Sequence, residues 1–126
     1  MHPAATSVTT FGLYAVATGI GLTLVPDLVL SPLGIPAPTE IWIRMVGALA
    51  VPLGYYYWAC GRANAVAFFH ASVRGRMVFA ALLVLLVAGF AAPVQLLLFA
   101  GIDLAGAAWT AYGLRAAARA GSGTPA

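Results

Sequence analysis

The sequence predicts an all-α protein, a bundle of four transmembrane helices with a proline-rich extracytoplasmic loop between the first and second helices. The 126-residue chain is 63% hydrophobic, only 7% charged and without lysine, so its charges are too few to cover a soluble domain of this size. Four apolar stretches are long enough to cross a hydrocarbon core of ~30 Å. We therefore expect one integral membrane domain over residues 1–126, with no separate catalytic module and no nucleic-acid partner.

The first helix is expected at about residues 8–25, because no charge precedes Asp27 and Pro26 is a natural stop. Its polar and small residues share one stripe, and either pack against another helix or form the wall of a polar cavity. These residues are Thr10, Tyr14, Thr18 and Gly21. No basic residue precedes the apolar run, which argues against a cleaved signal peptide.

The segment from Pro26 to Thr39 holds four prolines among apolar residues, so it cannot form a long helix. We expect it at the membrane surface, with a short helical turn around Asp27 to Leu30. It is either a hydrophobic cap over the bundle or a functional loop.

The second helix is expected at about residues 40–60, with Trp42 at one membrane interface and the aromatic run 55–58 at the other. Pro52 predicts a kink in the middle of the span. Arg44 lies about one turn inside the helix, where its side chain either extends to the interface or turns inward to meet an acid.

The third and fourth helices are expected at about residues 72–89 and 94–114, with a tight turn before Pro93 that makes them an antiparallel hairpin. Residues 68–76 are interpreted as an interfacial approach to the third helix. That helix is rich in Leu, Val and Ala and is the best candidate for lipid exposure. The tail, residues 116–126, is expected to be partly disordered, including all of its last six residues.

Arginine placement predicts the orientation, because cytoplasmic loops carry an excess of positive charge. Five of the six arginines follow the second and fourth helices, whereas Asp27, Glu40 and Arg44 lie at the opposite face. We therefore expect a multi-pass protein of the bacterial inner membrane with both termini in the cytoplasm. The five arginines are Arg62, Arg74, Arg76, Arg115 and Arg119.

Asp103 is the main candidate for a functional group, because it falls near the middle of the fourth helix, where an acid costs roughly 2.5–3.5 kcal/mol. The polar residues of that helix share its stripe, which should face the bundle interior. Arg44 is the expected partner, offset by about six residues or ~9 Å along the axis. The candidate ligand-binding residues are Asp103, Arg44, Tyr14, Thr18, Tyr55, Gln95 and Thr110.

Three interpretations of these residues remain open. Asp103 and Arg44 form a structural pair that sets helix register. Alternatively, they line a pocket for a polar-headed lipophilic ligand such as a quinone or lipid. In the third, an oligomer passes protons, ions or small molecules along Asp103.

The sequence offers no catalytic set and no metal motif, since His2 and His70 are far apart and Cys60 is the only cysteine. We therefore predict no cofactor beyond a possible quinone or lipid. The expected role is that of a binding, accessory or structural component rather than a self-sufficient enzyme. Its partners would be the lipid bilayer and either another membrane protein or further copies of this chain.

Over residues 10–115 the chain resembles small bacterial four-helix membrane proteins of the DoxX-like group. Some proteins of that group are membrane subunits associated with quinone-linked sulfur oxidation or with redox and detoxification partners. The resemblance thus implies a membrane subunit, and transfers no catalytic residue. The positions that carry it are Val25-Pro26, Trp42-Ile43-Arg44, Tyr55-Tyr56-Tyr57, Arg74-Gly75-Arg76, Asp103-Leu104 and Trp109.

Overall fold

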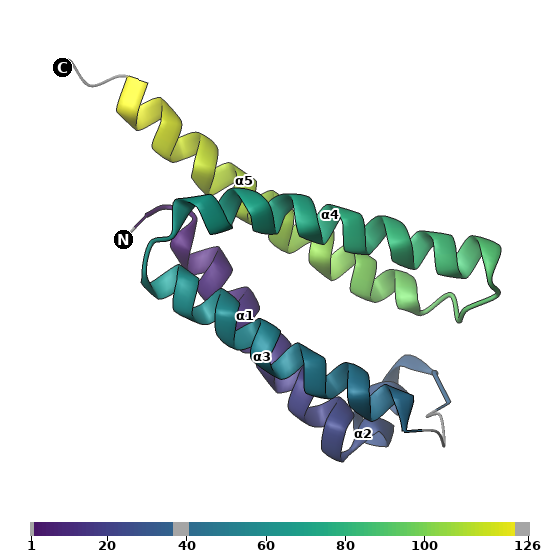
Figure 1. Cartoon of the computed structure of the whole chain (residues 1–126). Coiled ribbons are helices and arrows are strands. Elements are labelled where there is room, and N and C mark those ends of the chain that lie inside the picture. Colours follow the sequence, from purple (N-terminus) through teal and green to yellow (C-terminus); the bar gives the residue numbers. More distant parts are fainter. Residues whose placement is uncertain (1, 37–40, 123–126) are drawn as a thin grey trace.

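The computed structural model describes residues 2–36 and 41–122, and over these residues the chain is all-helical, as predicted. Five α-helices, one 3₁₀-helix and no strand occur in these two ranges (Figure 1). The elements are α1 (Ala5–Leu24), α2 (Pro26–Leu30), η1 (Ser31–Leu33), α3 (Trp42–Arg62), α4 (Val66–Gly89) and α5 (Leu96–Ser122).

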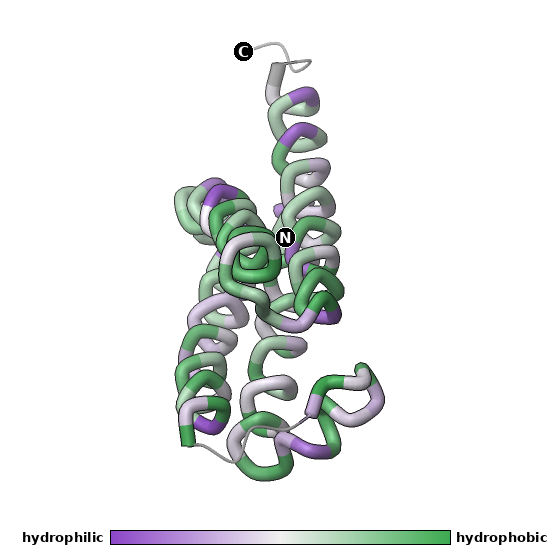
Figure 2. The backbone as a smooth tube through the Cα atoms, turned by 90° about the vertical axis from the view of Figure 1, so that its right-hand side faces the viewer, coloured by the Kyte–Doolittle hydropathy of each residue, from purple (hydrophilic) through white to green (hydrophobic). Residues whose placement is uncertain are grey.

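The four long helices form two pairs, α1 with α3 and α4 with α5. Figure 1 shows the pairs meeting near the N-terminus and diverging toward α2 and the α4–α5 connection. Figure 2 shows apolar residues around most of the circumference of the long helices. A helix that is apolar all round but exposed in an isolated chain is typical of a membrane span.

Helices α1 and α3 are in backbone contact because small residues recur seven residues apart on both, and a heptad repeat keeps them on one face. A Cβ atom added at Gly12 would lie 2.6 Å from the carbonyl oxygen of Gly54. One added at Gly19 would lie 2.6 Å from the carbonyl oxygen of Gly47. Any side chain at these positions would therefore force the two helices apart.

The proline-rich segment packs between the two pairs at their divergent end. The predicted helical turn is confirmed as α2, which starts at Pro26, and Gly34 ends η1 with a φ of 73°. Ile35 and Leu30 are buried with Leu22 of α1, and Leu96 and Phe99 of α5 pack on them. These contacts connect the α1–α3 pair to α5.

Three helices are longer than predicted, and α1 begins at Ala5 rather than residue 8. Helix α4 begins at Val66 rather than 72, because Phe69 is completely buried and holds the supposed interfacial approach in the helix. Helix α5 continues through the Ala-rich stretch to Ser122, so residues 121 and 122 of the tail are helical. The predicted start of the second helix at residue 40 and the tail residues 123–126 lie outside the described residues.

In the described part of the chain, three helices rather than the predicted four are long and apolar enough to cross a membrane by themselves. They are α1, α4 and α5. Helix α3 has sufficient length, but Arg44, Pro52 and the tyrosines at 55–57 reduce its hydropathy. The three apolar spans agree with the predicted membrane location.

Candidate functional site

Arg76 occupies the junction where the two helix pairs meet. It belongs to α4 and is only 2% exposed. Its Nη2 donates to the hydroxyl of Thr110 on α5 at 2.7 Å and to the Ser72 hydroxyl at 3.2 Å. Its Nε donates to the carbonyl oxygen of Ser72 at 3.3 Å. Arg76 therefore links α4 to α5 by charge-assisted hydrogen bonds, which are stronger than neutral ones.

The hydroxyl of Thr110 extends this network to α1. It lies 2.7 Å from the hydroxyl of Ser7, and both hydroxyls are buried. The Ser7 hydroxyl is also placed to donate to the carbonyl oxygen of Ala4 at 2.7 Å. The Thr110 hydroxyl is within 3.1 Å of the carbonyl oxygen of Gly106. These bonds satisfy buried polar groups that would otherwise be costly in an apolar environment.

Two aromatic rings cover the guanidinium of Arg76. Its Cζ lies 4.7 Å from the ring centre of Phe11 on α1 and 5.6 Å from that of Tyr57 on α3. Both distances are within the range of a cation–π interaction. All four long helices therefore contribute to the surroundings of this one cation.

Two polar groups at the junction lack hydrogen bonds to any of the described residues. The Nη1 atom of Arg76 is completely buried and has no such partner. Asp103 on α5 is 7% exposed, and its carboxylate likewise makes no hydrogen bond within these residues. The charges of Arg76 and Asp103 interact electrostatically without a direct ion pair. The site therefore contains a free donor and a free acceptor.

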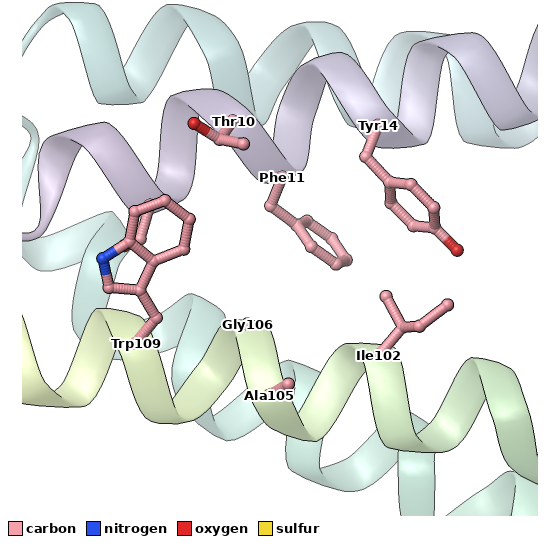
Figure 3. A pocket seen from close by; sticks show the side chains of 8 residues that line it. Thr10, Phe11, Tyr14, Ile102, Ala105, Gly106 and Trp109 are labelled. Carbon is pink, nitrogen blue, oxygen red and sulfur yellow. The ribbon is translucent and has the colours of Figure 1, made fainter.

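A cavity of about 250 Å³ lies beside this junction, between α1 and α5 (Figure 3). Its lining is mostly apolar, and Figure 3 shows the rings of Phe11, Tyr14 and Trp109 around it. The charge of Asp103 also acts on the Tyr14 hydroxyl. The cavity thus adjoins the polar junction while being apolar itself. Its lining residues are Ser7, Thr10, Phe11, Tyr14, Ile102, Ala105, Gly106 and Trp109.

The predicted pairing of Arg44 with Asp103 is wrong. The Nη1 of Arg44 donates to the carbonyl oxygens of Thr23 at 2.7 Å and Leu24 at 3.2 Å, in an exposed position. The last carbonyls of a helix have no partners within it, so they attract a nearby cation. Arg44 therefore caps the end of α1, and the cation near Asp103 is Arg76.

The other candidate residues divide into two groups. Tyr14 and Thr110 lie at the junction with Asp103, and Thr18 is half-buried next to Tyr14. Tyr55 is 56% exposed and its ring contacts Tyr56 and Trp58, away from the junction.

Gln95 precedes α5, and its amide lies beside Gly34 in the proline-rich segment. It is therefore separated from Asp103 by the first turns of α5.

Arg76 is buried in the bundle and does not lie at the cytoplasmic face, so the position predicted from the arginine distribution is wrong. Helical periodicity indicates this burial. Residues 74 and 76 lie about 200° apart around a helix, so their side chains point to different sides of α4 and only one of them can point away from the bundle. The residue at 76 shares a stripe with the apolar positions of α4, and the arginine at 74 is exposed. The buried stripe consists of Phe69, Ser72, Arg76, Ala80 and Leu83.

Comparison of the chain with protein-family models, with curated proteins and with solved structures finds no match. Within residues 2–36 and 41–122, no group of three or more His, Cys, Asp or Glu side chains is placed to hold a metal ion. The junction and the cavity beside it are therefore the features that indicate a function.

Proposed function

We propose that this chain is a multi-pass membrane protein that binds the head of a lipophilic molecule, a quinone or a lipid, in the cavity between α1 and α5. It would act as an accessory component that presents this molecule to a membrane partner. The single observation that carries the proposal is the position of the cavity, apolar in its lining and next to the buried Arg76. Ligand sites typically combine an apolar lining with a few convergent polar groups.

The size of the cavity suits part of a ligand rather than a whole one. At about 250 Å³ it falls slightly below the roughly 300–1,000 Å³ of typical ligand pockets. A ring or a small head group would fill it, and the hydrocarbon chain of the same molecule would remain in the bilayer. This division explains why an open cavity on the side of the bundle suffices for binding.

We also propose that α3 crosses the membrane alongside α1, completing a bundle of four spans. Its glycines are in backbone contact with α1, and its outward residues include Leu49 and Leu53. With Arg76 buried, four exposed arginines remain at the end of the bundle that holds the termini, against Arg44 at the other end. The excess still favours cytoplasmic termini. The four arginines are Arg62, Arg74, Arg115 and Arg119.

A bacterial inner-membrane location and a redox partner are parts of the same proposal. The resemblance to DoxX-like proteins supports both, since members of that group include membrane subunits linked to quinone chemistry. In this view the accessory chain holds the lipophilic molecule, and the chemical step takes place in the partner.

The test compares two matched substitutions on α5. Ala105→Phe would fill the cavity, whereas Ala108→Phe places the same ring at an exposed position outside it. The wild type and both variants would be purified in mild detergent and their bound small molecules identified by mass spectrometry. We expect a specific quinone or lipid with the wild type and with Ala108→Phe, and its loss with Ala105→Phe. Identical bound species in all three proteins would contradict a ligand site in this cavity and leave the junction a purely structural one.

A further inference from the structure

We propose that Arg76 selects the ligand, by donating a hydrogen bond from its Nη1 to an oxygen atom on the head of a neutral lipophile. This inference rests on the proposed function, because it names the chemistry that the α1–α5 cavity recognises. It assigns Arg76 as a specificity-determining residue of that site. The shared chemistry of the ligands is an uncharged oxygen acceptor, as in the carbonyl of a quinone or the ester of a neutral glycerolipid.

Of the three guanidinium nitrogens of Arg76, Nη1 is the one left to bind a ligand. Nη2 and Nε of Arg76 already bind Ser72 and Thr110, whereas Nη1 has no partner among the described residues. A guanidinium has five N–H groups in a fixed planar arrangement, so Nη1 cannot turn to share these acceptors. A buried donor without a partner is costly, and an acceptor brought to it by a ligand would remove this cost.

Nη1 packs against Gly106, a residue of the cavity wall that has no side chain. A Cβ atom there would lie 2.8 Å from Nη1 and 3.2 Å from Cδ2 of Phe11. Gly106 and Phe11 both line the cavity, so Nη1 packs directly behind two residues of the cavity wall. Because Nη1 has no exposed surface, the Phe11 ring must move aside when the ligand enters.

The charges at the junction also restrict the ligand. Asp103 already opposes the charge of Arg76 in the bundle interior, and its carboxylate has no hydrogen-bond donor among the described residues. An anionic head would add a second negative charge near Asp103 where charge interactions are poorly screened. The apolar cavity lining offers no further cation to offset it. The site therefore favours a neutral head over an anionic one.

The first experiment measures binding to the full-length protein in mild detergent. The probes are a short-chain benzoquinone, dioctanoylglycerol and decanoate at a pH where it is ionised. We expect one of the two neutral probes, or both, to bind at least ten times more tightly than decanoate. Whichever neutral probe binds more tightly shows whether the acceptor oxygen is the carbonyl of a quinone or the ester of a lipid. Decanoate binding as tightly as the tighter of the two neutral probes would overturn the inference.

The second experiment uses two glycines of α5 as a matched pair. Gly106→Ala puts a methyl group 2.8 Å from Nη1 and so must displace this nitrogen from the cavity wall, whereas Gly101→Ala meets no atom within 4 Å. We expect about 10- to 100-fold weaker binding for Gly106→Ala, as for loss of a hydrogen bond from a charged donor, and no change for Gly101→Ala. Arg76→Lys should weaken binding similarly, because the single side-chain nitrogen of lysine would bind the hydroxyls of Ser72 and Thr110 and leave no donor for the ligand. Equal binding by all variants would overturn the role of Arg76.

The third experiment observes the hydrogen bond in the wild type, with Gly106→Ala as the comparison. The benzoquinone, labelled with ¹³C at its carbonyls, is bound to the wild type, and the infrared band of the labelled carbonyl is recorded. A hydrogen bond from a guanidinium lowers the frequency of that band, and Gly106→Ala should restore it.

An unshifted band in a protein that binds the quinone would overturn this inference while leaving the proposed function intact. Failure of the wild type to bind any of the three probes would instead contradict both.

Discussion

The α1–α3 interface and the junction at Arg76 differ in the contacts that dominate them. Along α1 and α3, glycines bring the two backbones into contact, and a Cβ atom at Gly54 would lie 2.6 Å from the carbonyl oxygen of Gly12. Around Arg76 the helix pairs meet through side chains, including the hydrogen bond from Arg76 to Thr110 and a buried apolar cluster that contains Val8 and Phe69. Backbone contact occurs there at Gly113 of α5, where a Cβ atom would lie 2.7 Å from Cα of Ala4.

The difference follows from the membrane as a solvent. Lipid tails are as apolar as leucine, so apolar side chains gain little by leaving lipid for another helix. Helices then associate by close backbone packing or by polar contacts. Backbone packing at glycines extends along α1 and α3, whereas the junction has the buried hydrogen-bond network of Arg76. The α1–α3 backbone contact leaves no room for a side chain at its glycines, whereas the junction has a cavity of about 250 Å³ beside it. Binding is therefore expected at the junction.

The largest expected effect is at the junction. Arg76→Met removes the cation and leaves Asp103 as an uncompensated buried charge, which should cost about 3–5 kcal/mol of unfolding free energy. The measurement is denaturant-induced unfolding in detergent micelles. Asp103→Asn added to Arg76→Met should recover much of this loss, because no buried charge then remains. A double variant as unstable as the single one would show that Asp103 does not depend on Arg76.

The next effect is at the α1–α3 interface. Gly54→Ala puts a methyl group against the backbone of α1, which should cost about 2–3 kcal/mol, the upper part of the range for overpacking. The same unfolding titration would measure it. The matched control is Gly75→Ala on α4, where no atom lies within 4 Å, and it should be neutral or stabilising by up to about 1 kcal/mol. Equal stability of both variants would contradict backbone contact between α1 and α3.

A smaller effect is expected where the junction reaches α1. Ser7→Ala removes the hydrogen bond to Thr110, while Thr110 keeps Arg76 and the carbonyl oxygen of Gly106 as partners. The expected loss is about 1 kcal/mol, as for one neutral hydrogen bond. Thermal unfolding followed by circular dichroism would detect it. A loss as large as that of Arg76→Met would mean that the hydroxyls, rather than the cation, hold the pairs together.

The smallest effect is expected at Arg44, whose guanidinium is exposed and binds two backbone carbonyls at the end of α1. Arg44→Gln should change the unfolding free energy by less than about 1 kcal/mol. It should leave ligand binding unaltered, since Arg44 is not at the cavity. The calorimetric midpoint and the bound species of the variant would be compared with those of the wild type. A loss of bound ligand in this variant would show that Arg44 does belong to the ligand-binding site.

Much of the local structure was predictable from single helices. Proline and charge positions indicated where helices end, and the stripe on α5 correctly placed Asp103 and Thr110 inside the bundle. The low charge and long apolar stretches indicated a membrane protein, in agreement with three spans of sufficient hydropathy. These features depend on chain composition and on a helical period that is the same in every helix, so the sequence by itself determined them.

Only the tertiary structure decided which residues face each other. A helical period shows which residues share a face, but not how far that helix is rotated or how deep it lies beside its neighbours. Arg44 and Arg76 were both possible partners of Asp103 by residue type. Helix α1 ends beside Arg44, so Arg44 binds a backbone carbonyl oxygen at that end. Helices α4 and α5 run side by side, so Arg76 of α4 binds Thr110 of α5 in the bundle interior. The physical reason is that a buried charge is stabilised by whichever groups the helix packing brings within reach.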